Sequence, residues 1–195
     1  MNLPVAETER LRLVGWDEER RAAFVRATNT PAVMRWLGGV NDEAQMASAM
    51  ARLDSYQRDH GFTFWAVERK KDGAVLGFCG LKRANAPGAE PLHGQVEIGW
   101  RLREDAWGQG YAKEAAIASM DLAFERFGAP HVIALTAVGN LPSQGLMKRL
   151  GMRRMPEFDY IDARFAEDDS PSPQVVYRID RDEWPAARAA ALAQR

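Results

Sequence analysis

The sequence predicts a single α/β domain, spanning residues 1–195, in which a mixed sheet carries helices on both faces. Segments with alternating apolar and polar residues are interleaved with segments whose apolar residues recur at helical spacing. An antiparallel meander in the middle of the chain is followed by a helix and then by an almost wholly apolar strand. With 195 residues, 46% of them apolar, the chain can bury one core without disulfides or metals.

The first third of the chain is expected to hold one strand and three helical segments. Leu11 and Leu13 alternate with arginines, which indicates a half-buried strand, and Asp17 is a favourable residue to cap the helix that follows. The expected elements are a strand within 9–16, a helix from Asp17 to about 29, a short helix that starts at Thr30-Pro31 and carries Met34, Trp36 and Leu37, and a helix over about 42–60 ended by Gly61.

The rest of the chain is expected to alternate between strands and helices. The expected elements are strands over 62–67 and 74–81 joined by the Asp72-Gly73 turn, a strand over 96–102, a helix from 111 stopped by 128–130, a strand over 131–138, a helix from Asn140 closed by Gly151, a strand over 175–179 and a final helix from Asp182. A helix lies between the strands 96–102 and 131–138, so these two are expected to be parallel neighbours. The polar stretch 167–173 is expected to be an exposed loop between two strands.

Composition excludes several classes of function. The chain has 26 basic and 27 acidic residues, so no overall positive field draws it to nucleic acid or to a membrane surface. No targeting segment or apolar run long enough to cross a bilayer is found, and a cytoplasmic location is expected. A metal site is not expected, because the one cysteine and the three histidines lie far apart: Cys79, His60, His93 and His131. The oligomeric state is left open, with a homodimer as one option.

A glycine-rich turn over residues 105–115, between an expected strand and an expected helix, carries the main chemical signal. Gly108 and Gly110 remove Cβ atoms where the backbone must come close to a ligand. The helix that follows directs free N–H groups outwards at its N-terminus, an arrangement that binds phosphates. A tight turn without a ligand is the plain alternative. A dinucleotide-binding fold does not fit, because the third glycine is missing and the turn follows an antiparallel meander.

The turn at 107–112, with the strand 97–102 before it, resembles the acetyl-CoA pyrophosphate loop of the GNAT acetyltransferase superfamily. More narrowly, it resembles the RimJ/RimL-like branch, which includes enzymes that acetylate N-terminal amines of ribosomal proteins. Three further segments agree in order and spacing, and the resemblance covers nearly the whole chain: residues 7–13, 140–152 and 176–184. The resemblance implies the GNAT acyl-CoA N-acyltransferase fold, acetyl-CoA as cosubstrate and an amine as acceptor.

The resemblance also implies which residues hold acetyl-CoA. The superfamily pattern Gln/Arg-x-x-Gly-x-Gly/Ala falls on Trp107, Gly110 and Ala112, and Trp107 departs from its polar first position. This departure matters little if backbone amides contact the phosphates. The pantetheine arm would enter a splay between the strands 96–102 and 131–138, while Asn140 would bond to the cofactor or only cap its helix. The implied set is Leu102, Trp107, Gly108, Gln109, Gly110, Tyr111, Ala112 and Asn140.

Acetyl transfer to an amine requires the amine to be neutral. At pH 7 an α-amino group of pKa about 7.7–8.0 is neutral roughly 10–15% of the time, whereas a lysine side chain pays roughly 4.6 kcal/mol to lose its proton. Glu97 is the base that the resemblance implies, and a solvent-facing strand glutamate is the alternative. A register slip of one residue would turn this side chain to the other face of the sheet.

The sequence offers one candidate for the acid that would protonate the leaving thiolate. Many superfamily members use a tyrosine where this chain has Met147, which cannot donate a proton. Ser143 stands where the branch is thought to use a serine, with a structural cap as the alternative. Trp36 lies in the segment that lines the acceptor mouth in related proteins, where it could contact substrate or only pack. Cys79 is expected to be a buried core residue, so no acetyl-enzyme is expected.

The sequence leaves several alternatives open. A non-catalytic acetyl-CoA-binding module and a sheet-based interaction domain remain rivals to an enzyme. The acceptor could be a peptide N-terminus, a small-molecule amine, a polyamine or an antibiotic. The acidic segment 167–169 would favour a cationic acceptor if it lies near the acceptor mouth.

Overall fold

The computed structural model describes residues 3–166, 169 and 171–194, which form two compact units. The first unit is drawn from Met1–Arg35, Gly39–Lys82 and Gly99–Ser119, and the second from Trp36–Gly38, Arg83–Ile98 and Met120–Arg195. Both units combine strands with helices, so the predicted α/β class is confirmed. No helix in the described ranges is both long enough and apolar enough to cross a membrane.

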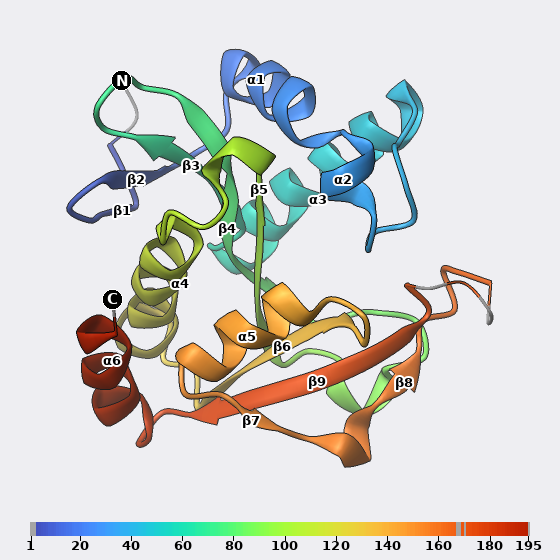
Figure 1. Cartoon of the computed structure of the whole chain (residues 1–195), viewed down its shortest axis with the longest axis vertical. Helices are drawn as coiled ribbons and strands as arrows, with labels where there is room; N and C mark the ends of the chain where they lie inside the picture. The colour runs from blue at the N-terminus through green and yellow to red at the C-terminus, as the bar shows by residue number, and fades with distance from the viewer. Residues whose placement is uncertain (1–2, 167–168, 170, 195) are drawn as a thin grey trace. The chain divides into compact units, whose positions relative to one another are not determined.

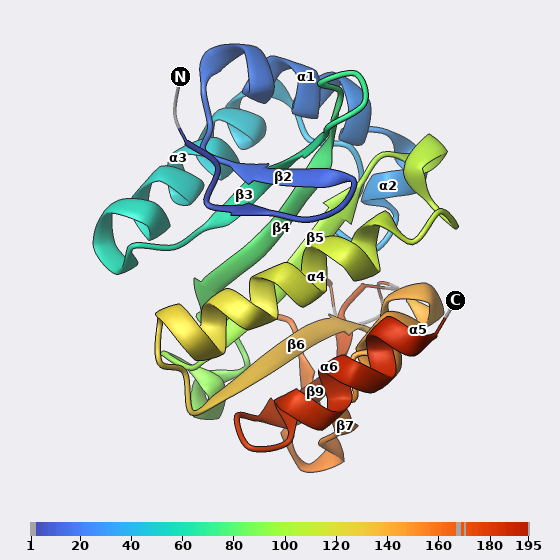
Figure 2. The same cartoon turned by 90° about the vertical axis from the view of Figure 1, so that its left-hand side faces the viewer.

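The first unit is an antiparallel group of strands with helices on both sides. Its elements are β1 (Ala6–Glu7), β2 (Leu11–Val14), α1 (Glu18–Thr28), α2 (Pro31–Met34), α3 (Glu43–His60), β3 (Phe64–Arg69), β4 (Val75–Arg83), the second half of β5 (Val96–Leu102) and most of α4 (Tyr111–Asp121). Strands β1 to β4 are neighbours in chain order, and each pairs antiparallel with the next. In both views α4 lies on the opposite side of β4 from α1 and α3 (Figure 1, Figure 2).

The ends of the helices follow the local signals in the sequence. Asp17 accepts a 2.8 Å hydrogen bond from the Arg20 backbone N–H, and Gly61 ends α3 with a φ of 77°. The short helix α2 ends at Met34, so Trp36 and Leu37 lie in the turn after it and not inside a helix as predicted. The cause is the pair of glycines at 38 and 39, whose φ values of 88° and 90° end the helical path.

The core of the first unit is formed where α1 and α3 cover β4. Phe24 of α1 packs against Phe78 of β4, with ring centroids 5.4 Å apart. On the opposite side of β4 the Cys79 sulfur accepts a hydrogen bond from the Ser119 hydroxyl of α4 at 3.5 Å. Cys79 is fully buried, which confirms that it is a core residue. The main buried cluster comprises Phe24, Met46, Met50, Leu53, Val75 and Phe78.

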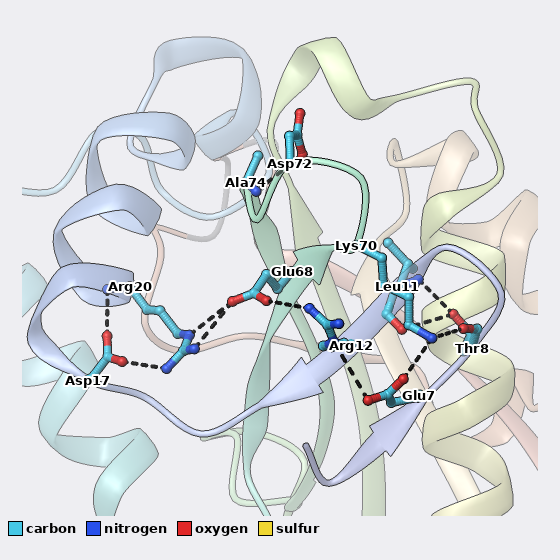
Figure 3. A network of polar contacts seen from close by, with 10 residues as sticks. All are labelled: Glu7, Thr8, Leu11, Arg12, Asp17, Arg20, Glu68, Lys70, Asp72 and Ala74. Atoms are coloured by element: carbon cyan, nitrogen blue, oxygen red, sulfur yellow. Dashed lines mark hydrogen bonds and ion pairs between the residues drawn. The ribbon is translucent and has the colours of Figure 1, made fainter. Parts of the chain in front are cut away.

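A chain of ion pairs ties the N-terminal hairpin to β3 and α1 (Figure 3). The Glu68 carboxylate of β3 contacts Arg20 of α1 at 3.2 Å and Arg12 of β2 at 3.4 Å. Farther along, Glu7 of β1 contacts Arg12 at 3.6 Å and Lys70 at 2.7 Å. Ion pairs that remain partly exposed to water are individually weak, so we assign them a role in fixing the position of the hairpin more than in adding stability.

The second unit is built around the long strand β9. Its elements are the first half of β5, β6 (His131–Ala137), α5 (Leu141–Arg149), β7 (Arg153–Arg154), β8 (Tyr160–Ile161), β9 (Pro173–Asp180) and α6 (Trp184–Ala193). β6 runs parallel to β5, with Glu97 opposite Ile133, as predicted, and antiparallel to β9. β7 and β8 both pair with β9. One strand was expected before the 167–173 loop, without bounds, and the structure has two short ones there; two residues are too few to show an alternation, so neither could be placed from the sequence.

The second unit has its own core and its own helix anchors. The segment 84–92 packs its apolar residues against Ile133 and Val176 on the sheet, and α5 runs alongside β6 and β9 (Figure 1). Trp184, at the start of α6, donates from its indole nitrogen to Asp121 at 2.9 Å. The predicted exposed loop does fall between β8 and β9, but its residues 167, 168 and 170 lie outside the described residues.

Candidate active site

The turn that leads into α4 needs glycine at two positions. Gly108 and Gly110 have φ values of 70° and 79°, a left-handed conformation that costs other residues roughly 1–2 kcal/mol. A Cβ at residue 108 would meet no atom within 4 Å, so the backbone angle alone requires glycine there. A Cβ at residue 110 would lie 3.4 Å from the Arg10 guanidinium, an ordinary contact, so there too the backbone angle is what requires glycine.

Residues 107–110 form tight turns, and none of the five successive backbone N–H groups of residues 108–112 makes a short, well-aligned hydrogen bond in the part of the chain that the structure describes. The first backbone bond of the helix runs from the Glu114 N–H to the Gly110 carbonyl at 3.0 Å. Free N–H groups at a helix N-terminus attract anions, both by direct hydrogen bonds and through the helix dipole. The turn therefore has the donors that a diphosphate group requires.

Trp107 stands where the superfamily pattern has a polar residue, and its indole has a structural role in the loop. Its indole N–H donates to the Leu102 carbonyl at 2.8 Å, which fastens the loop to the end of β5. The Arg103 N–H donates to Leu76 of β4 at 2.8 Å, so by the alternation of a strand the backbone of Leu102 faces away from β4. Because Trp107 occupies the Leu102 carbonyl, the Leu102 N–H is the group that this residue can offer to a ligand.

Glu114 fixes the first turn of α4 and was not singled out from the sequence. One of its carboxylate oxygens accepts from the Thr8 hydroxyl at 2.5 Å and from the Arg10 backbone N–H at 2.8 Å, and the other from the Arg10 Nε at 2.6 Å. Burial raises the pKa of Glu114, but the bonds from Thr8 and Arg10 outweigh it, and the net pKa is lowered. Arg10 also covers the Tyr111 ring at 4.4 Å and bonds to the Gln109 carbonyl at 3.0 Å.

In the second unit, Asn140 caps α5. Its side-chain oxygen accepts from the Ser143 backbone N–H at 3.4 Å, and its amide nitrogen donates to the Thr136 hydroxyl at 3.0 Å. The capping alternative is therefore confirmed, while the amide keeps one further hydrogen and one further lone pair for a ligand. The Ser143 hydroxyl bonds to no other residue within the described ranges, and Met147 is buried as a core residue.

Trp36 lies beside the start of α5. A Cβ on Gly139 would come within 2.6 Å of the Trp36 ring, so the indole rests directly on the backbone next to Asn140. The ring of Phe165 makes the same kind of contact with Gly38, where a Cβ would lie 2.7 Å away. The second unit thus brings Trp36, Asn140 and Ser143 together, and it adds Phe165, which the sequence analysis did not find.

Glu97 is buried, with 8% of its surface exposed, which shows that the solvent-facing alternative is wrong. It lies opposite Ile133, where β5 pairs with β6. Burial raises the pKa of Tyr160, and the charges of Asp162 and Glu97 raise it further. The hydrogen bond to Asp162 raises the pKa of Arg164, and the negative charge of Glu97 raises it further. Tyr160, Asp162 and Arg164 thus form, with Glu97, a group of titratable residues that no sequence pattern indicated.

Comparison with known proteins identifies the family. Residues 10–153 match the acetyltransferase (GNAT) domain, which is well over half of the chain. The chain belongs to the GNAT acetyltransferase family. Bacillus subtilis YkkB is 30% identical over 74% of this chain and 83% of its own length. An Aspergillus fumigatus protein named FsC-acetyl coenzyme A-N(2)-transacetylase is 29% identical over 93% of this chain and 78% of its own.

A solved structure shows the same fold. The acetyltransferase from Agrobacterium tumefaciens strain C58 superposes with a TM-score of 0.73 at 24% identity, covering 92% of this chain and 95% of that one. The predicted GNAT fold is confirmed, and the chain is an N-acetyltransferase, which sets aside both non-enzymatic alternatives. Among the residues that the structure describes, no three or more His, Cys, Asp or Glu side chains are grouped to hold a metal ion.

Proposed function

We propose that this N-acetyltransferase moves the acetyl group of acetyl-CoA directly to an amine acceptor, and that it belongs to the RimJ/RimL-like branch. The observation that carries the proposal is the run of five free N–H groups at residues 108–112, which suits the pyrophosphate of the cofactor. The relative from Aspergillus fumigatus has acetyl coenzyme A in its name. The family match spans both compact units, which supports one domain over residues 1–195.

In the proposed reaction each of a few residues has a separate role. The Leu102 backbone N–H polarises the thioester carbonyl, and Glu97 takes a proton from the acceptor amine, directly or through water. Ser143 protonates the leaving thiolate where protonation is needed, although a thiol of pKa about 8.5 can also leave as the anion. Asn140 holds the cofactor with its remaining amide hydrogen, and Trp36 lines the acceptor side.

Direct transfer is favoured over an acetyl-enzyme by the state of Cys79. Burial raises the pKa of this thiol to about 12, only partly offset by the bond from Ser119. At neutral pH it is therefore protonated as well as buried, and neither property suits a nucleophile. The amine itself must attack the thioester.

The basicity of the amine favours a peptide α-amine, with a small-molecule amine as the other acceptor class. An α-amine needs only about 1 kcal/mol to become neutral at pH 7, whereas an unactivated lysine needs roughly 4.6 kcal/mol. The matched test uses one lysine-free peptide with a free N-terminus and one N-terminally blocked peptide with an internal lysine, and follows release of free CoA.

We expect acetyl-CoA to bind in calorimetry and only the peptide with a free N-terminus to be acetylated. Acetylation of the blocked peptide alone would reverse the preference, and acetylation of neither would point to a small-molecule amine. Absence of acetyl-CoA binding would refute the proposed donor itself.

A further inference from the structure

Arg101 is a partly buried cation beside the apolar core of the first unit. It lies on β5, and its guanidinium stands 5.2 Å from the centre of the Phe78 ring and 5.6 Å from that of Phe24. Phe78 also stacks on Phe64 at 4.8 Å, so the guanidinium faces a continuous aromatic surface. Stacking on aromatic faces stabilises a guanidinium but leaves its hydrogen-bond donors unused.

The donors of Arg101 are not used by the protein. Its Nε is fully buried without an acceptor, and the side chain makes no hydrogen bond or ion pair with any other residue in the described ranges. Asp105, four positions along the chain, is already paired with Arg103 at 2.5 Å. An unsatisfied donor on a charged group is costly, and because the side chain is partly exposed, a ligand can reach the outer nitrogens of the guanidinium.

The charges around Arg101 also favour the binding of an anion. Burial, and to a smaller degree the positive charge of Arg52, lower the pKa of Arg101 to about 10. At pH 7 the side chain nevertheless remains protonated. Arg52 thus adds positive charge around Arg101, and no described carboxylate offsets it.

The position of Arg101 places this cation beside the expected reaction centre. It directly precedes Leu102, whose N–H is proposed to hold the thioester carbonyl, and its side chain projects to the α1 side of the sheet. Thr30, the N-cap of α2, donates to Glu104 at 3.1 Å, so the start of α2 also lies close to this end of β5.

We propose that Arg101 binds a carboxylate of the acceptor, so that the preferred acceptor is an amine that also carries a carboxylate group. This inference rests on the proposed acetyl-CoA-dependent transfer for its location, but the anion site itself is defined by the aromatic rings and the unused donors. The guanidinium offers two parallel N–H donors, which match the two oxygens of a carboxylate. The positive charge also disfavours polyamines and other polycationic acceptors.

The test uses amines with and without the carboxylate: glycine, β-alanine and 4-aminobutyrate, each beside its carboxamide, with kcat/KM expressed per neutral amine because the carboxylate makes the amine more basic. The full chain with acetyl-CoA should show a preference of about 10- to 100-fold in kcat/KM for the carboxylate form of at least one length, the range expected for a charge-assisted bidentate contact. In Arg101→Met this preference should vanish, with the carboxamide rate nearly unchanged. Arg58→Gln, which removes an exposed charge on α3, is the matched control and should keep the preference.

Two further measurements separate this site from other roles of Arg101. Removal of an uncompensated buried charge should raise the Tm by roughly 2–4 °C in Arg101→Met, since replacing buried charges by apolar residues often stabilises. A fall in Tm with equal losses on both amine forms would make Arg101 structural and overturn the proposal. The acetyl-CoA Kd should not change, and a tenfold rise would assign the arginine to a cofactor phosphate instead.

The outcomes also distinguish this inference from the proposed function. Turnover without any carboxylate preference would leave the acetyltransferase proposal standing and overturn the anion site. If no amine of the panel is acetylated, the same amino acids are tested as ligands by thermal shift. Stabilisation by an amino acid but not its amide, lost in Arg101→Met, would support the anion site alone. Equal shifts with both forms, or none, would overturn it.

Discussion

The Glu114 carboxylate holds Arg10 with two separate groups, the backbone N–H at 2.8 Å and the side-chain Nε at 2.6 Å. The residues are 104 positions apart, and this contact joins the N-terminal hairpin to the first turn of α4. The same turn carries the free N–H groups proposed to hold the cofactor. A hairpin remote in the sequence therefore contacts the first turn of the helix that follows the candidate phosphate-binding turn.

Replacing Glu114 should weaken acetyl-CoA binding without unfolding the protein. Glu114→Gln removes the charge that bonds Thr8 and Arg10, and we expect the acetyl-CoA Kd to rise about 10-fold, the value of one charge-assisted hydrogen bond. Calorimetry measures the effect. Glu43→Gln is the matched control, because Glu43 also lies in the first turn of a helix but is exposed. Equal effects of both substitutions would mean that the change in net charge, and not the contacts of Glu114 with Thr8 and Arg10, weakens binding.

The contribution of Glu114 to stability should depend on pH in a defined direction. Its pKa in the folded protein is lowered from the ordinary value of 4.5, so the carboxylate stabilises the fold fully above that value. The contribution is lost as the pH falls through the lowered pKa. The difference in urea midpoint between wild type and Glu114→Gln should therefore be constant between about pH 6 and pH 8 and shrink below about pH 4.5. A difference that grows in acid would contradict the assignment.

Substitutions at Gly110 and Gly73 should distinguish the effect of backbone strain from an effect on cofactor binding. Gly110→Glu should abolish acetyl-CoA binding, because a bulky anion would occupy the turn that attracts phosphate. Gly73→Ala is the control for strain alone, since Gly73 has a similar φ of 71° in the hairpin turn between β3 and β4. Both substitutions should cost roughly 1–2 kcal/mol of stability, but only the change at 110 should affect acetyl-CoA affinity. Unchanged affinity in a folded Gly110→Glu protein would place the phosphate site elsewhere.

Cys79 should be inert in the native protein. Its burial and its pKa of about 12 predict no reaction with iodoacetamide at pH 8 until denaturant is added. Cys79→Ala should retain acetyl transfer and lose about 1 kcal/mol of stability, the cost of a small cavity. Mass spectrometry and a kcat measurement test the two statements. A mutant that folds but fails to transfer acetyl groups would revive an acetyl-enzyme.

The features that were predicted correctly are those that depend on neighbours in sequence. Asp17 and Gly61 mark helix ends through bonds to residues within four positions, and the alternation along 96–102 extends over a whole strand. The same local logic failed for Trp36, because it gave too little weight to the glycines at 38 and 39.

The features that were missed depend on residues far apart in the chain. The partner of Glu114 lies in the N-terminal hairpin, and the aromatic surface under Arg101 combines residues of α1, β3 and β4. No window of sequence contains such a contact. The candidate cofactor turn was therefore readable from its glycines, while the residues that contact it and the aromatic surroundings of Arg101 were not.

Glu97 provides the sharpest test of the proposed mechanism. If Glu97 is the base, Glu97→Gln should lower kcat at pH 7 by about 10²- to 10⁴-fold, the usual contribution of a positioned base, and leave the acetyl-CoA Kd nearly unchanged. The loss should shrink at pH 9, because an α-amine of pKa about 7.7–8.0 is then mostly neutral without help. Glu157→Gln, an exposed residue outside the proposed site, is the control for a change of net charge. An equal loss at pH 7 and pH 9 would remove Glu97 from the role of base and leave its buried position, near Tyr160 and Arg164, as a structural one.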